Sequence, residues 1–424
     1  MPKLLQINPV VRRNTSTGKI MLEIGELAAA KGWESYVAFS RGRDGDGKAA
    51  LGGCSSVPVP VGSRLSVALH GLETRLFDRH GLGSLLATLR FIREIRRIDP
   101  DVIHIHNVHG YFLNYPLFFR YLAGCGKPVI WTVHDCWLYT GHCYYYSAAA
   151  CDRWKARNGG CRNCPQRGSF PKSWLIDRSS GNYRDKAAAF TSIPSERMLF
   201  VPVSSWMREE MAQSFLAGCR FRVIHNGIDT EVFSPRDPQA VRRKYGLGDR
   251  RVILGVASIW TREKGFGELR AIARNTWDDE VVVMVGRMTP EQRALLPENV
   301  VVIGRTENQE ELAQLYSAAT VFVNPTWQDN YPTVNLESIS CGTPVVTYRT
   351  GGSVESIVED ETGFVIEQGD VAGLVAAIRF IERTGKERYS AACRSYALAH
   401  FRKQDRYAEY LELYSSLLSG ESAL

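Results

Sequence analysis

Long apolar runs are missing from this chain, and so is an N-terminal stretch with the composition of a secretory signal. No uninterrupted apolar segment approaches the roughly 18–20 residues needed to cross a bilayer. The opening residues already place a polar Asn8 ahead of any long apolar stretch. The first absence argues against a membrane-spanning helix and the second against secretion. We therefore expect a cytoplasmic protein whose thiols stay reduced.

Repeats at solenoid periods and low-complexity tracts are also absent, which argues against a repeat array or a disordered tail. Charge of one sign is only in mild excess, with 52 basic and 45 acidic residues and a formal net charge of +7. So dispersed a surplus suits anionic small molecules or an anionic membrane surface. No nucleic-acid motif accompanies it, so we expect no nucleic-acid partner.

The 424 residues are too many for one compact domain, and two domains are expected. Short Val- and Ile-rich runs alternate with helical patterns, as in parallel sheets covered on both faces. The expected strands are residues 4–8, 36–39, 102–106, 129–134, 199–203, 252–257, 281–285, 300–303, 321–323 and 345–347. This pattern predicts the α/β class, with two doubly wound, Rossmann-like parallel-sheet domains facing a cleft.

The strand series breaks once, after the turn Asn226-Gly227-Ile228-Asp229. We place an N-terminal domain at residues 1–228, with a Cys-rich insertion at 136–177 where the α/β rhythm stops. A C-terminal domain follows at 229–402. The final helix, within 403–424, is expected to pack back toward the N-terminal domain.

A candidate anion site lies in the second half, where a strand near residue 256 runs into a loop with Arg262, Lys264 and Gly265. The two cations leave the strand end where a diphosphate could lie, and the glycine allows close backbone approach at the start of a helix. Taken alone, the loop is equally typical of a solvated surface turn.

The segment 324–337 strengthens this interpretation because it also follows a strand and opens a helix. Pro332 suits a first helical turn and leaves the amides of Thr333 and Val334 available to an anion. Asp329 and Glu337 could accept hydrogen bonds from vicinal hydroxyls of a ribose or a hexose; each alone could equally be a capping or surface acid. The remaining expected donor contacts in this segment are Asn330 and Tyr331.

This ordered set of residues resembles family 4 of the retaining glycosyltransferases, which have the GT-B fold. By that resemblance Lys264 binds the donor diphosphate, with Arg262 standing in for the family arginine, whose position is occupied by Ile259. Glu337 matches the second acid of the family's Glu-x7-Glu pattern and holds the donor ribose. Asp329 occupies the position of the first acid. The resemblance implies metal-independent catalysis, with no cofactor required.

In the first half, Thr132-Val133-His134-Asp135 ends a strand as the family's donor-sugar histidine does, although a lone histidine there is also typical of a core. Gly18 lies in a segment, 14–19, that resembles the family's flexible loop over phosphate and acceptor. Asn107 and His109 follow another strand and are the candidate acceptor contacts. His134-Asp135-Cys136-Trp137, with the cysteines after it, resembles transferases of colanic-acid and related exopolysaccharide pathways.

Cysteines cluster in the insertion. Cys161-x2-Cys164 has zinc-knuckle spacing, and Cys143 and Cys151 could complete a structural zinc site. Such a metal would order a loop poor in regular structure. The alternatives are buried free thiols or, in an oxidising compartment, disulfides.

A basic amphipathic helix is expected around residues 85–98, with leucines and isoleucines on one face and four arginines elsewhere. It could cover the first sheet, lie on anionic lipid, or do both. The second role predicts peripheral contact with the inner face of the plasma membrane.

The sequence thus predicts a retaining glycosyltransferase that moves a hexose from a nucleotide-diphosphate sugar to a glycan or lipid-linked acceptor in bacterial exopolysaccharide biosynthesis. Three alternatives remain open, of which the first is a GT-B scaffold without activity, given Asp329 and the missing arginine. The other two are functions of a different kind. One is a nucleotide-sugar epimerase on the same fold, and the other is a zinc-dependent nucleic-acid-binding protein.

Overall fold

The computed structural model describes residues 1–11, 16–42 and 51–420. The chain divides into two compact units. Unit 1 comprises Met1–Ile224 together with Tyr407–Leu424, and unit 2 comprises His225–Arg406.

Unit 1 is built on a six-stranded sheet. Its strands are β1 (Lys3–Ile7), β2 (Glu34–Phe39), β3 (Val57–Pro60), β4 (Val102–Ile105), β5 (Val129–Val133) and β6 (Met198–Pro202). They lie in the order β3-β2-β1-β4-β5-β6, and all neighbours pair in parallel. The order of addition reverses between β1 and β4. Ligands of doubly wound sheets bind beyond the carboxyl ends of the strands at such a reversal.

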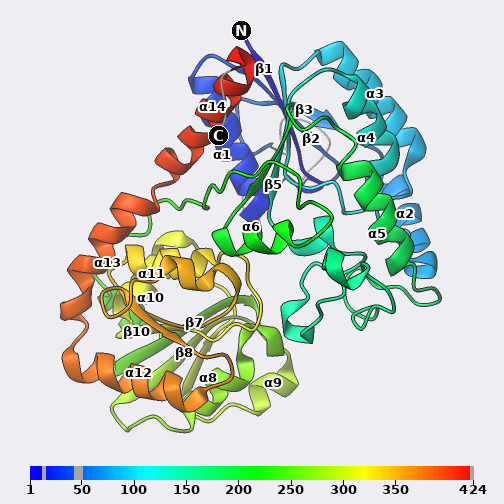
Figure 1. The fold of residues 1–424 in the computed structure, drawn as a ribbon. Helices are drawn as coiled ribbons and strands as arrows, with labels where there is room; N and C mark the ends of the chain where they lie inside the picture. The colour runs from blue at the N-terminus through cyan, green and yellow to red at the C-terminus, as the bar shows by residue number, and fades with distance from the viewer. Residues whose placement is uncertain (12–15, 43–50, 421–424) are drawn as a thin grey trace. The chain divides into compact units, whose positions relative to one another are not determined.

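Helices cover both faces of this sheet, so its strands are apolar on both sides (Figure 1). They are α1 (Ser16–Ala30), α2 (Arg64–Phe77), α3 (Leu85–Ile98), α4 (Tyr115–Gly124), α5 (Ser179–Phe190), α6 (Ser205–Ala212) and α14 (Lys403–Ser419). In Figure 1, α1 and α14 lie on one side of the sheet and α3, α4 and α5 on the other. The first four residues of α14 are counted with unit 2.

Unit 2 repeats the same topology. Its strands are β7 (Arg251–Ile259), β8 (Glu280–Arg287), β9 (Val300–Ile303), β10 (Val321–Asn324), β11 (Val345–Tyr348) and β12 (Gly363–Ile366). Their order is β12-β11-β10-β7-β8-β9, again wholly parallel, with the reversal between β7 and β10. The helices are α7 (Gln239–Lys244), α8 (Phe266–Ala273), α9 (Pro290–Ala294), α10 (Gln309–Ala318), α11 (Thr333–Ser340), α12 (Val371–Thr384) and α13 (Glu387–His400).

All ten strands expected from the sequence are present, and the predicted fold class is confirmed. The two strands that the pattern misses, β3 and β12, each lie at one edge of their sheet, and the opposite edges are β6 and β9, which the pattern predicts. Strand β3 has the sequence Val57-Pro58-Val59-Pro60, and prolines are tolerated in a sheet only where no ladder partner needs their amide. The two prolines of β3 and the leading glycine of β12 are residues disfavoured in strands, so the strand pattern is weak at both.

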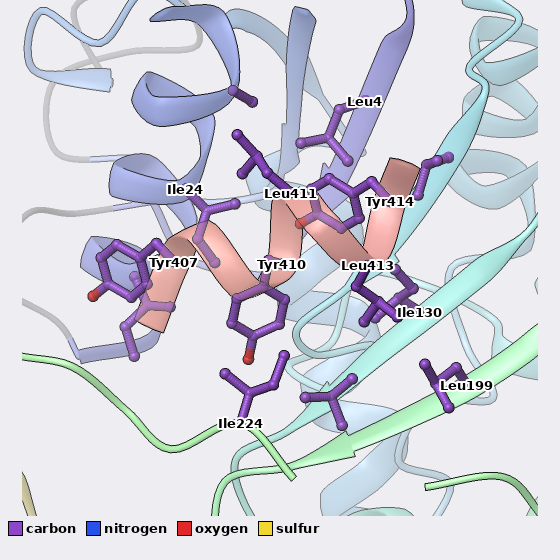
Figure 2. Close-up of a cluster of buried hydrophobic side chains, with 14 residues drawn as sticks. Leu4, Ile24, Ile130, Leu199, Ile224, Tyr407, Tyr410, Leu411, Leu413 and Tyr414 are labelled. Carbon is purple, nitrogen blue, oxygen red and sulfur yellow. The ribbon is translucent and has the colours of Figure 1, made fainter. Parts of the chain in front are cut away.

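The C-terminal helix α14 packs into the core of unit 1. Tyr407, Tyr410 and Tyr414 are buried, and Figure 2 shows them lying beside apolar side chains such as Ile24 and Ile130. A buried tyrosine needs a partner for its hydroxyl. Tyr407 Oη donates to Glu23 Oε2 at 3.1 Å, and Tyr414 Oη lies 2.7 Å from His104 Nδ1.

Within the described ranges, no helix is both long enough and apolar enough to span a membrane. The predicted amphipathic helix is α3, but its apolar residues do not form one face. Ile92, Ile95 and Ile98 are buried, whereas the leucines of its first turns are exposed, Leu86 by 71%. The isoleucines therefore cover the sheet, while the leucines and the four arginines face outward.

Candidate active site

The loops that follow β7 and β10 meet at the strand reversal of unit 2. Trp327 N donates to the carbonyl oxygen of Glu263 at 2.8 Å, and Thr326 Oγ1 donates to the same oxygen at 3.2 Å. Gly265 has φ +78°, and a Cβ there would lie 2.5 Å from the carbonyl oxygen of Pro325. Only glycine permits this approach of the two loops.

Lys264 and Asp329 are joined by this meeting of the loops. Their Nζ and Oδ2 atoms form an ion pair at 2.8 Å, with 38% of the lysine side chain and 19% of the carboxylate side chain exposed. Lysine has three N–H donors, so its pairing with Asp329 leaves donors for a second anion. The two residues predicted to bind diphosphate and sugar thus lie together where a doubly wound sheet binds its ligand.

The amino end of α11 follows the Asp329 loop. The helix begins at Thr333, and Pro332 lies in the capping position just before it rather than in the first turn. The amides of Thr333 and Val334 belong to the first turn, whose N–H groups have no partner within a helix and carry its positive dipole end. Asn330 and Tyr331 are buried, and Tyr331 stacks on the His225 ring at 4.7 Å. Their side chains contribute packing within unit 2.

Glu337 lies one turn further along α11. Its half-buried carboxylate accepts a hydrogen bond from Tyr316 Oη at 3.1 Å. Burial raises the pKa of the Tyr316 phenol, so it stays protonated and remains a donor. This bond fixes one carboxylate oxygen, Oε2, in position.

Arginines lie at the same sheet edge. Arg262 is exposed within the short 3-10 helix η5 (Arg262–Lys264). Arg287 was missed by the sequence analysis; it ends β8, is exposed, and lies in register with Ile259 of the neighbouring β7. Ile259 occupies the position of the absent family arginine, and Arg287 lies beside it on the adjacent strand. An arginine directly after the apolar run 281–286 marks the carboxyl end of a strand, and this pattern could have identified Arg287 from the sequence.

At the strand reversal of unit 1, two hydrogen-bonded asparagines lie where unit 2 has the Lys264–Asp329 ion pair. Asn8 follows β1 and Asn107 follows β4 by two residues, and Asn107 Nδ2 donates to Asn8 Oδ1 at 3.1 Å. Asn8 Nδ2 in turn donates to the carbonyl oxygen of Val10 at 2.7 Å. Asn107 is thus placed at the expected edge, but its side chain is buried and already bonded.

His134 follows β5 directly and is half-buried. Its Nε2 lies 3.2 Å from Nδ1 of His106, which follows β4. Burial lowers the pKa of His134 to about 4 and that of His106 well below its usual value. Both rings are therefore neutral at physiological pH.

His109 is engaged at both ring nitrogens. Its Nε2 lies 2.9 Å from Asp135 Oδ2, and its Nδ1 lies 3.0 Å from Tyr144 Oη. Burial raises the pKa of Asp135, but the charge and hydrogen bond of His109 and the amide of Trp137 outweigh it and lower that pKa overall. An acceptor could bind His109 only by replacing one of these bonds, and its acceptor role stays a prediction.

Gly18 lies in the third position of α1 and is buried. Residues 16–19 of the predicted flexible loop are therefore helical, and its first two residues, 14 and 15, lie outside the described ranges. The helix amino end follows β1, so the segment retains an anion-favouring dipole.

The Cys-rich insertion contains buried polar groups that are bonded within the chain. Lys186 Nζ donates to the carbonyl oxygens of Trp137 and Thr140 at 2.6 and 2.9 Å, and lies 3.4 Å from the indole centre of Trp137. His142 and Asp78 form a fully buried pair at 2.6 Å. These contacts order the loop from within the chain, and the need for zinc stays a prediction.

The four predicted zinc ligands remain thiols without a shared centre. Cys143 and Cys164 are hydrogen-bonded to each other, and Cys161 Sγ accepts a bond from the Gly141 amide at 3.1 Å. Cys151 is half-buried. In the part of the chain that the structure describes, no three His, Cys, Asp or Glu side chains are arranged to hold a metal ion. As they are arranged here, the residues do not fit zinc, and the site stays a prediction.

Both halves of the chain match family models of glycosyltransferases. A family model described as Glycosyltransferase Family 4 matches residues 18–232, and one described as Glycosyl transferases group 1 matches residues 250–382. The chain is 25% identical over 431 residues to the colanic acid biosynthesis glycosyl transferase WcaC of Escherichia coli, covering 98% of this chain and 100% of WcaC. A GDP-mannose-dependent mannosyltransferase of Mycolicibacterium smegmatis is 30% identical, over 52% of this chain and 63% of its own length.

Solved structures confirm the GT-B fold. A sucrose-phosphate synthase from Thermosynechococcus elongatus superposes with a TM-score of 0.71 at 17% identity, covering 99% of this chain and 100% of its own. Anabaena HepE, solved in complex with UDP, gives 0.68 at 17% identity, with coverage of 98% and 100%. The chain belongs to Glycosyltransferase Family 4 and is a glycosyltransferase.

Proposed function

We propose that this glycosyltransferase moves a hexose from a nucleoside-diphosphate sugar to a glycan or lipid-linked saccharide, with retention of anomeric configuration and without a metal ion. The observation that carries the proposal is the Lys264–Asp329 ion pair at the strand reversal of unit 2. It provides a cation for a diphosphate beside a carboxylate for sugar hydroxyls, and the amino end of α11 follows in the chain.

The donor is held mainly by unit 2 in this proposal. The diphosphate lies against Lys264, Arg262 and the first amides of α11, and Glu337 accepts hydrogen bonds from ribose hydroxyls. Cations and helix amides neutralise the charge that develops on the leaving phosphate, the role a metal ion takes in other transferases. Asp329 accepts hydrogen bonds from the sugar, and this exchange releases Lys264 toward the diphosphate.

In unit 1, His134 contacts the donor sugar. As the bond between the anomeric carbon and the phosphate oxygen breaks, the sugar becomes oxocarbenium-like and the acceptor oxygen bonds to the same face. A donor phosphate oxygen takes the acceptor proton. The protein contributes positioning and charge stabilisation, and no side chain forms a covalent intermediate.

The acceptor is proposed to belong to exopolysaccharide synthesis, because a relative that matches along its whole length is named for colanic acid biosynthesis. A lipid-linked acceptor would bring the enzyme to the inner face of the plasma membrane. Support for this comes from α2 and α3, whose outward leucines form an exposed apolar surface. They are Leu65, Leu69 and Leu72 on α2 and Leu85, Leu86 and Leu89 on α3, each 43–71% exposed.

The two helices that carry these leucines are joined by a hydrogen bond, and cations line a groove beside α3. His70 of α2 lies 2.9 Å from the hydroxyl of Ser84, which precedes α3, so this bond ties α2 to the start of α3. Beyond them a groove of about 710 Å³ between α3 and α4 is lined by Arg93, Arg96, Arg120 and Lys127 among others. An apolar surface bordered by cations suits the interface of an anionic bilayer.

A thermal-shift panel of UDP, GDP, ADP, dTDP and CMP tests the donor site. A ligand at about 100 times its Kd should stabilise the protein by about 2.7 kcal/mol. One selective nucleoside diphosphate, with its effect lost in Lys264→Ala, is the expected result; its sugar nucleotides are then assayed with acceptor glycans, and NMR of the product reports the anomeric configuration. An inverted product would refute retention, and a panel without any shift would refute the donor site.

Vesicle flotation tests the membrane contact. We expect binding to vesicles containing phosphatidylglycerol and little binding to phosphatidylcholine alone, with loss in Leu65→Ser/Leu69→Ser/Leu86→Ser. The matched control is Leu295→Ser/Leu398→Ser, which alters leucines of unit 2 that are 51% and 38% exposed. Equal loss in both variants would contradict the proposed surface.

A further inference from the structure

A chain of buried hydrogen bonds runs from the core of unit 1 to His134. Gln6 Nε2 donates to the carbonyl oxygen of Met21 at 2.9 Å, and Gln6 Oε1 lies 3.1 Å from His106 Nε2. His106 Nδ1 then lies 3.2 Å from His134 Nε2. Gln6 and His106 are fully buried.

The direction of each bond follows from its first member. A carbonyl oxygen can only accept, so the amide nitrogen of Gln6 must face Met21 and its oxygen must face His106. An oxygen also only accepts, so His106 carries its proton on Nε2. A neutral imidazole has one proton, so His106 Nδ1 is an acceptor and His134 must donate to it from Nε2.

We propose that Gln6 and His106 are positioning residues that hold His134 in the tautomer protonated on Nε2, with Nδ1 unprotonated. The ring of His134 can then accept a hydrogen bond at Nδ1 and cannot donate one there. Neither positioning residue has to touch the substrate to act.

Two features keep this chain of hydrogen bonds, the Gln6–His106–His134 relay, in one protonation state. The His104 ring lies 4.1 Å from that of His106, and His104 is bonded to Thr132 and to Tyr414 of α14. Burial lowers the pKa of His106 well below its ordinary value and that of His134 to about 4, so neither ring of the relay gains a second proton near neutral pH.

The inference rests on the proposed function for its consequence, which concerns the donor sugar. A ring nitrogen that only accepts can bind a sugar hydroxyl, which donates. It would repel the carboxylate of a uronic acid, which has no proton to give at neutral pH. The relay therefore selects neutral hexoses over uronic acids at the position that His134 contacts.

The tautomer is measurable without any ligand. The full-length protein is labelled with 15N-histidine, and long-range 15N–1H spectra report which ring nitrogen carries the proton. Signals of His134 are assigned by their loss in His134→Asn. We expect a protonated Nε2 and an unprotonated Nδ1 for His134 at neutral pH; a proton on Nδ1 would overturn the proposal whatever the enzyme's substrate is.

Two variants of His106 test the consequence. In His106→Asn the amide oxygen can replace Nδ1 as acceptor, whereas His106→Phe keeps a ring but has no acceptor. We expect His106→Phe to raise the KM for the sugar nucleotide about tenfold and to leave the affinity for the nucleoside diphosphate unchanged, since one hydrogen bond is lost. His106→Asn should bring the KM for the sugar nucleotide most of the way back to the wild-type value.

UDP and UDP-glucose serve as the first probe pair. If the KM for UDP-glucose rises equally in both variants, or if the affinity for UDP also falls, His106 has only a structural role and the proposal is refuted. If the wild-type protein binds no nucleoside diphosphate of the panel, the proposed function fails. The 15N measurement still shows whether Gln6 and His106 hold His134 in the Nε2-protonated tautomer.

Discussion

The Lys264–Asp329 pair allows a sharp test of how this enzyme would stabilise its leaving group. In Lys264→Ala the diphosphate loses its nearest cation in unit 2, while the fold loses only a partly exposed ion pair. The lysine side chain is 38% exposed, and pairs of this kind contribute about 0–1 kcal/mol to stability. The melting temperature should therefore change little.

The expected effect on turnover is far larger. An ammonium about 4 Å from a developing unit charge contributes about 4 kcal/mol when the effective dielectric constant is about 20. Because about 1.4 kcal/mol corresponds to a factor of ten, kcat should fall about 10³-fold. Removal of one preorganised charge-stabilising group in other enzymes costs about 10²–10³-fold, which agrees with this figure.

The assay is steady-state transfer from the donor that the panel selects, with melting curves recorded alongside. Lys244→Ala is the matched control, because Lys244 is 42% exposed and is paired with Glu307 at 2.5 Å in the same unit. The control should retain its activity. The reasoning is refuted if Lys264→Ala keeps near-wild-type kcat, or if its loss matches the loss in the control.

Four further predictions concern other groups of the two units. Glu337→Gln should weaken nucleoside-diphosphate binding by about 1–3 kcal/mol through a lost charged hydrogen bond, and unchanged affinity in calorimetry would contradict the ribose role. Arg287→Ala should lower kcat more than Arg250→Ala does, if its guanidinium replaces the missing family arginine; equal rates would exclude it. The pKa values of His104 and His134 are lowered by burial to about 3 and about 4, whereas unfolded histidines titrate near 6.5. The unfolded chain thus binds more protons below that pH, and the free energy of unfolding should fall from about pH 6.5 toward pH 4; urea titrations showing the opposite slope would refute this. Metal analysis of protein purified without chelators should find one zinc per chain if the predicted Cys site exists, and no zinc would dismiss it.

Local sequence determined the class of this fold. Ten of the twelve strands were predictable because a strand covered on both faces must be apolar throughout, and that requirement is written in consecutive residues. The loops carrying Lys264, Asp329 and His134 were recognised for the same reason, since each comes directly after such a run. Parallel strands then send their carboxyl ends to one edge, so the site could be assigned to an edge before any pairing was known.

The tertiary structure decided which of these residues meet. Lys264 and Asp329 are 65 positions apart, and only the adjacency of β7 and β10 brings them within 2.8 Å. Register alone places Arg287 beside Ile259. His109, an acceptor candidate by its place after a strand, has both ring nitrogens occupied by Asp135 and Tyr144.

The physical reason for this division lies in the two kinds of interaction. Burial of a strand depends on its own side chains, so a single segment of sequence reveals it. A hydrogen bond or an ion pair depends on two groups that are distant in the chain, and neither sequence segment records its partner. The tautomer relay from Gln6 through His106 to His134 spans three strands for that reason, and only their pairing order creates it.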